Sequence, residues 1–85
     1  MWNILLHPKV SKFIENLESH LQERIKSKLR ELKEDPFRFL EHFEGESHYK
    51  LRMGEYRALI DIDFKNKELK IQVLDHRSRI YKRNI

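Results

Sequence analysis

The chain has no cysteine, and it has only two glycines and two prolines among its 85 residues. The absence of cysteine excludes a disulfide framework, a thiolate zinc site and a cysteine nucleophile. Two glycines leave no room for a glycine-rich loop that cradles phosphate groups. No apolar run approaches the roughly 20 residues of a membrane span, and the start of the chain lacks the features of a signal peptide. We therefore expect a soluble, cytoplasmic protein without membrane association.

The length suits one domain and is too short for two. Charged residues make up 38% of the chain, against about a quarter in a typical domain. The apolar residues nevertheless recur at regular spacings, which argues against disorder. We expect a single domain over residues 1–85.

Positive charge is concentrated in the second half of the chain. Residues 1–46 contain eight Lys/Arg and nine Asp/Glu, a net charge of −1, whereas residues 47–85 contain ten and five, a net charge of +5. Such an asymmetry favours a polyanionic partner for the C-terminal half.

The first half has the pattern of a strand followed by two helices. Residues 2–6 form an apolar run that is typical of a strand buried on both faces. Pro8 suits the first position of a helix, because its missing N–H would have no partner there. Ser19 and Gln22 have the form of a capping box that begins a second helix, and Pro36 ends it.

The second half has the alternation of a three-stranded meander. Residues 36–46 are expected to form a connecting loop whose three phenylalanines are tucked against the core: Phe37, Phe39 and Phe43. Apolar residues then alternate with polar ones over 49–53, 56–64 and 69–73. The predicted architecture is β-α-α-β-β-β, an α+β fold with a helical hairpin packed on a small, mainly antiparallel sheet.

The register of the first hairpin follows if Gly54 and Glu55 form a two-residue loop. Arg52 then pairs with Arg57. Because paired and alternate residues share a face, the face turned away from the core gathers several basic side chains: His48, Lys50, Arg52 and Arg57. Two arginines directly opposite each other repel, whereas a phosphate group between them accepts hydrogen bonds from both. The pattern indicates a phosphate-binding face.

The last strand is expected to extend this face. Pairing Phe64 with Leu69 places His76 beside Arg57 on the same side of the sheet. Further candidates follow just beyond: Arg77, Arg79 and Tyr81.

Such a cluster suits metal-free cleavage of RNA, whose own 2′-hydroxyl is the nucleophile. Cations hold the phosphate and stabilise its developing charge, and a histidine or a tyrosine moves the protons. His76 and Tyr81 are the proton carriers closest to the cluster in sequence. Asp61 and Asp63 are only a weak metal-binding candidate, and we expect no metal and no cofactor. Simple phosphate binding is equally compatible with these residues.

Two short motifs together resemble the RelE/ParE superfamily of bacterial and archaeal toxins, in particular its RelE branch. They are Lys50-Leu51-Arg52-x-x-x-Tyr56-Arg57 and Asp75-His76-Arg77-x-Arg79-Ile80-Tyr81. The predicted order of strands and helices is also that of the family. The resemblance implies the toxin of a type II toxin–antitoxin system, a metal-free endoribonuclease that cuts mRNA in the ribosomal A site and so inhibits translation.

The resemblance also implies roles for individual residues. Lys50 and Arg57 would bind the scissile phosphate, Arg77 would stabilise the transition state or assist the leaving group, and Tyr81 would be the general base. RNA contacts would come from a further set: His48, Arg52, His76, Arg79 and Lys82.

Two departures from the family pattern bear on proton transfer. His48 stands where some relatives have the first lysine of a Lys-x-Lys motif, and the Arg77-to-Tyr81 spacing is two residues shorter than in the best-studied branch. His76 or His48 is therefore an alternative to Tyr81 as the proton carrier.

The resemblance implies a RelB-type antitoxin that wraps the toxin, in a toxin–antitoxin heterotetramer, besides the ribosome and mRNA. Two other functions stay open. One is a ParE-like inhibitor of DNA gyrase, although the basic cluster favours the RelE branch. The other is a non-catalytic RNA-binding module.

Overall fold

The computed structural model describes residues 1–42 and 48–80. Its five-stranded sheet has the order β1-β5-β4-β3-β2. The strands are β1 (Asn3–Leu6), β2 (Leu40–His42), β3 (Tyr49–Met53), β4 (Tyr56–Asp63) and β5 (Glu68–His76). The helices are α1 (Pro8–Glu15), α2 (Ser19–Glu34), the 3-10 turn η1 (Pro36–Arg38) and α3 (Arg77–Ile80). The predicted α+β class and the helical hairpin are confirmed.

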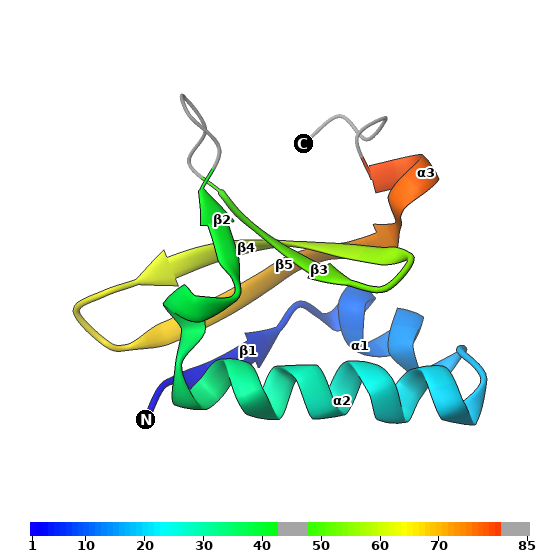
Figure 1. Ribbon diagram of the computed structural model, residues 1–85, viewed down its shortest axis with the longest axis horizontal. Coiled ribbons are helices and arrows are strands. Elements are labelled where there is room, and N and C mark those ends of the chain that lie inside the picture. Colours follow the sequence, from blue (N-terminus) through cyan, green and yellow to red (C-terminus); the bar gives the residue numbers. More distant parts are fainter. Residues whose placement is uncertain (43–47, 81–85) are drawn as a thin grey trace.

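The two longer helices cover one face of the sheet, and α3 lies on the other side (Figure 1). The core fills the layer between α1, α2 and the sheet. Its fully buried side chains include Ile25 and Leu32 from α2 and Leu51, Ile60 and Leu69 from the strands. We call the opposite face of the sheet, which α1 and α2 leave uncovered, the open face. In the part of the chain that is described, no helix is long and apolar enough to span a membrane.

The helix starts differ in part from expectation. Pro8 is the first residue of α1, as predicted, and the Lys9 N–H donates a hydrogen bond to His7 Nδ1 at 3.1 Å. The predicted capping box is wrong, because Glu18 is the N-cap of α2 and Ser19 already lies in the helix. Gln22 instead donates to the Leu17 carbonyl at 2.8 Å, which satisfies a carbonyl between the two helices.

Strand β1 pairs in parallel with β5 and is an edge strand. The prediction that it is buried on both faces is wrong: Leu5 is 44% exposed and Leu6 is 36% exposed. The physical reason is that helices cover only one face of the sheet and no strand lies beyond β1 among the described residues.

The expected loop over 36–46 is wrong in part, because Leu40–His42 forms β2 and pairs antiparallel with β3. Phe39 is partly buried against the core, as expected. Phe37 is 50% exposed and stacks on Phe64, with ring centroids 5.9 Å apart, so its expected place in the core is wrong. Phe43 lies outside the described residues.

The register between β3 and β4 is confirmed, with Arg52 opposite Arg57. The predicted register between β4 and β5 is wrong. Asp63 pairs with Glu68, and the register shifts between Leu59 and Ile60. The turn begins one residue earlier than expected, and Asp63 anchors it: the Asn66 N–H donates to Asp63 Oδ1 at 3.0 Å and the Asn66 amide donates to Oδ2 at 2.8 Å.

Candidate phosphate-binding face

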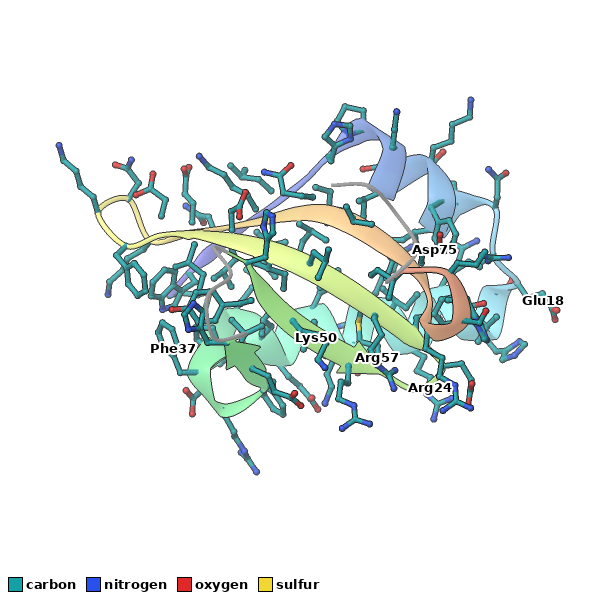
Figure 2. All side chains as sticks on the ribbon, turned by 90° about the horizontal axis from the view of Figure 1, so that it is seen from above. Glu18, Arg24, Phe37, Lys50, Arg57 and Asp75 are labelled. Atoms are coloured by element: carbon teal, nitrogen blue, oxygen red, sulfur yellow. The ribbon has the colours of Figure 1, made fainter. Side chains whose placement is uncertain are left out.

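Alternation along β3 and β4 brings three predicted site residues to the open face. Lys50 and Arg52 are alternate residues of β3, and Arg57 on β4 is directly opposite Arg52. Figure 2 looks onto this face, where Lys50 and Arg57 project from neighbouring strands. We call these three side chains the cation row. The structure thus confirms the predicted register that brings these three side chains to one face.

A carboxylate from β2 faces the cation row. Glu41 pairs with Lys50 in the register between β2 and β3. Its Oε2 lies 3.5 Å from Lys50 Nζ, and its Oε1 lies 3.9 Å from Arg52 Nη1. Glu41 was missed from the sequence because β2 itself was not predicted. It lowers the net positive charge that the row presents.

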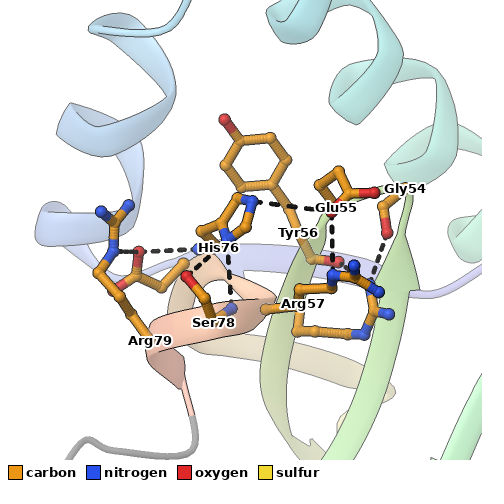
Figure 3. A network of polar contacts seen from close by, with 9 residues as sticks. Gly54, Glu55, Tyr56, Arg57, His76, Ser78 and Arg79 are labelled. Atoms are coloured by element: carbon orange, nitrogen blue, oxygen red, sulfur yellow. Dashed lines mark hydrogen bonds and ion pairs between the residues drawn. The ribbon is translucent and has the colours of Figure 1, made fainter.

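Arg57 is the buried member of the cation row, with only 7% of its surface exposed. Its Nη1 donates to the Gly54 carbonyl at 2.6 Å and to the Tyr56 carbonyl at 2.9 Å (Figure 3). Its partner in the register with β5 is Asp75, which is 4% exposed. The hairpin therefore holds this guanidinium rigidly, as a fixed positive charge beneath the more exposed members.

His76 does not join the cation row. It pairs with Tyr56 instead of Arg57, and the two rings meet edge to face with centroids 5.7 Å apart. The prediction that His76 lies beside Arg57 is wrong because of the register shift within β4. Its Nδ1 accepts a hydrogen bond from the Ser78 N–H at 3.1 Å, and its Nε2 lies 3.7 Å from Glu55 Oε2.

Arg77 and Arg79 follow in α3. The Arg77 N–H donates to the Glu55 carbonyl at 2.7 Å, and its Nε lies 2.9 Å from Glu55 Oε2, so the start of α3 is tied to the β3–β4 turn. Arg79 Nε donates to Asp75 Oδ1 at 3.0 Å. Both side chains are largely exposed, at 60% and 64%. Tyr81 and Lys82 lie outside the described residues.

His48 lies on the open face at the β2 side of the sheet, one residue before β3. Its Nδ1 is 2.7 Å from Asp61 Oδ1, and Gln72 Nε2 donates to Asp61 Oδ2 at 3.2 Å. This network joins β4 and β5 to the start of β3. From the sequence Asp61 was only a weak metal-binding candidate, and its pairing with His48 was not foreseen.

Several of the predicted cations therefore have carboxylate partners. The ion pair of Arg52 with Glu41 is exposed on both sides and spans 3.9 Å, so it contributes at most about 1 kcal/mol and a bound phosphate can replace Glu41 there at small cost. Over residues 1–42 and 48–80, no group of three or more His, Asp or Glu side chains lies close enough to hold a metal ion.

Residues 4–81 match the family described as the ParE toxin of type II toxin–antitoxin system, parDE. Because the match spans most of the chain, the protein belongs to this family of toxins within the RelE/ParE superfamily. The superfamily expected from the two sequence motifs is confirmed. A comparison with curated protein sequences gives no match.

Solved structures with the same fold include a chain of the archaeal RelE–RelB complex of Pyrococcus horikoshii. That chain is 26% identical, with a TM-score of 0.79 over 92% of this chain and 97% of its own length. A chain of the RelBE2 toxin–antitoxin complex of Mycobacterium tuberculosis is 20% identical, with a TM-score of 0.77 over 89% and 98%. The isolated RelE toxin of E. coli is 20% identical, with a TM-score of 0.71 over 96% and 93%. The last two likenesses concern the fold alone.

Proposed function

We propose that this toxin is a ribosome-dependent endoribonuclease that cuts mRNA in the ribosomal A site and so inhibits translation. The observation that carries the proposal is the cation row, three basic side chains on one open face with two arginines directly opposite each other. Arg57 is held by hydrogen bonds within the hairpin, but like charges placed opposite each other still repel. A phosphodiester bound between the two arginines would offset that repulsion.

The roles follow from the exposure of each cation. Lys50 and Arg52 bind the phosphate in place of Glu41, and Arg57 is a preorganised positive charge close to the developing oxyanion. Arg77 on α3 is exposed enough to reach the leaving group. The 2′-oxygen attacks phosphorus and the 5′-oxygen departs, which leaves a 2′,3′-cyclic phosphate and a 5′-hydroxyl. Neither a metal nor a cofactor is needed for this chemistry.

The proposed partner is a RelB-type antitoxin, in a heterotetramer, because similar chains occur in RelE–RelB complexes. Such a partner would cover the open face with acidic side chains. The proposed site of action is the ribosome in the cytoplasm.

The test is cleavage of mRNA on programmed ribosomes, with cut ends mapped by primer extension. Arg77→Ala is the informative variant, because the Arg77 side chain is 60% exposed and the hydrogen bond from its backbone N–H to the Glu55 carbonyl remains. Arg38→Ala, which removes a cation from η1 away from the open face, is the matched control. We expect cuts in the A-site codon with the wild type and the control, and a loss of about 100-fold with Arg77→Ala. Intact mRNA with folded wild-type protein would refute the proposal.

A second function is favoured by the family description itself, which names ParE. Loss of DNA gyrase supercoiling, measured with the same preparation, would support a ParE-like inhibitor. Salt-sensitive RNA binding without cutting would instead indicate a non-catalytic RNA-binding module.

A further inference from the structure

The network around His48 has the geometry of an oriented base. His48 Nδ1 lies 2.7 Å from Asp61 Oδ1. An ionised carboxylate can only accept hydrogen bonds, so Nδ1 must carry the proton of the neutral imidazole. The lone pair is therefore on Nε2. A second hydrogen bond, from Gln72 to the other oxygen of Asp61, fixes the carboxylate in turn.

We propose that His48 is the general base that takes the 2′-hydroxyl proton during RNA cleavage, and that Asp61 is its positioning residue. The inference rests on the proposed function and deepens it, because it gives proton transfer to His48 in place of Tyr81. A nucleophile, a base and a group that orients the base are the recurring parts of such sites. Here the RNA supplies the nucleophile.

The position of His48 relative to the cation row supports this role. His48 and Lys50 are alternate residues of one chain segment, so their backbones are roughly 6–7 Å apart on the same face. A phosphate held by Lys50 thus has the imidazole within side-chain reach. The charged groups that neighbour His48 on this face come from four strands: Asp61 on β4, Lys70 opposite it on β5, Lys50 on β3 and Glu41 on β2. His48 is 24% exposed and Asp61 is 39% exposed, so RNA can reach the pair.

The other histidine near the motifs is arranged differently. The Nδ1 of His76 accepts a hydrogen bond from the Ser78 N–H, and its ring packs against Tyr56. The register places His76 on the face of the sheet opposite the cation row. The structure therefore distinguishes the two histidines, which the sequence left as equal alternatives.

The step balances as follows. His48 Nε2 takes the proton of the 2′-hydroxyl as the 2′-oxygen forms its bond to phosphorus. The bond from phosphorus to the 5′-oxygen breaks, and this oxygen takes a proton from water to become the 5′-hydroxyl. The imidazolium returns its proton to the resulting hydroxide, which regenerates the neutral base.

The test compares three histidine variants in the programmed-ribosome assay. His48→Gln keeps a donor for Asp61 but has no basic nitrogen, and His48→Ala leaves space for added imidazole. His20→Ala is the control, because His20 lies on α2 with a 72% exposed side chain. We expect both His48 variants to cut at least about 100-fold more slowly, imidazole to restore part of the rate of His48→Ala, and the control to match the wild type.

The positioning role of Asp61 has its own readout. Asp61→Asn is expected to lower the cleavage rate with unchanged RNA affinity.

Two failures are distinguishable. If the wild type leaves mRNA intact, the proposed function fails and this inference fails with it. If the wild type cuts but His48→Gln cuts within threefold of it, or if added imidazole leaves the rate of His48→Ala unchanged, only the inference is overturned.

Discussion

The buried and exposed arginines of the hairpin provide a matched pair for a stability experiment. Arg52 and Arg57 are opposite each other, yet the Arg52 side chain is 62% exposed while Arg57 is 7% exposed. Arg57→Ala removes two charge-assisted hydrogen bonds, to the carbonyls of Gly54 and Tyr56. At about 1.5–3 kcal/mol for each such bond, the expected loss in unfolding free energy is at least about 3 kcal/mol.

Arg52→Ala should cost at most about 1 kcal/mol, because its single ion pair with Glu41 spans 3.9 Å at the surface. For a domain of this size, 1 kcal/mol corresponds to about 4–8 °C in the melting midpoint. By the same conversion, Arg57→Ala should melt at least about 12 °C below the wild type. Urea and thermal unfolding followed by Trp2 fluorescence measure both variants. Equal stability of the two variants would refute the structural role of Arg57. If the expected difference is found, a loss of cleavage in Arg57→Ala reflects lost stability as well as any lost catalytic role.

Three further predictions concern other parts of the fold. Glu41→Gln removes the negative charge that faces Lys50 and Arg52. RNA affinity should therefore rise, and the slope of log affinity against log salt should steepen by about 0.7 in titrations at several salt concentrations. An unchanged slope would contradict this. The pKa of Asp63 is lowered from its ordinary value of 3.8 by hydrogen bonds from Asn66. Ionised Asp63 thus stabilises the folded state above pH 3.8, and this stability is lost as the pH falls through the lowered pKa. Between about pH 5 and 2, the melting midpoint of Asp63→Asn should therefore fall less steeply with pH than that of the wild type. Parallel pH dependences of the two midpoints would refute this. Gly54 has φ +64° in the hairpin turn, so Gly54→Ala should cost about 1 kcal/mol in urea unfolding, and no loss would contradict the strain argument.

The first hairpin could be predicted from the sequence because its register depends on local signals. Gly54 marks the turn, and alternation of apolar and basic residues fixes which side chains share a face. These two signals are enough to place Lys50, Arg52 and Arg57 together on one face of the sheet.

Most of the remaining errors have nonlocal causes. Strand β2 has only three residues, which is too short for an alternation of apolar and polar residues to be recognised. Because β2 was not predicted, its residue Glu41 was missed. The register of β5 depends on a shift between Leu59 and Ile60 and on the contacts of Asp63 within the turn, neither of which leaves a periodic signal. This error placed His76 on the wrong side of the sheet. The pairing of His48 with Asp61 has a local cause, because it continues the confirmed β3–β4 register by one pair beyond Tyr49 and Ile60, and it was overlooked.

The most direct test of metal-free cleavage by the RNA's own hydroxyl uses a chemically altered message. Ribosomes are programmed with an all-ribose mRNA or with the same mRNA carrying a single 2′-deoxynucleotide at the mapped cut site in the A-site codon. The account predicts that the toxin cuts the first message, leaving a 2′,3′-cyclic phosphate, and does not cut the second at that position. Equal cutting of both messages would contradict it, because the nucleophile would then come from elsewhere.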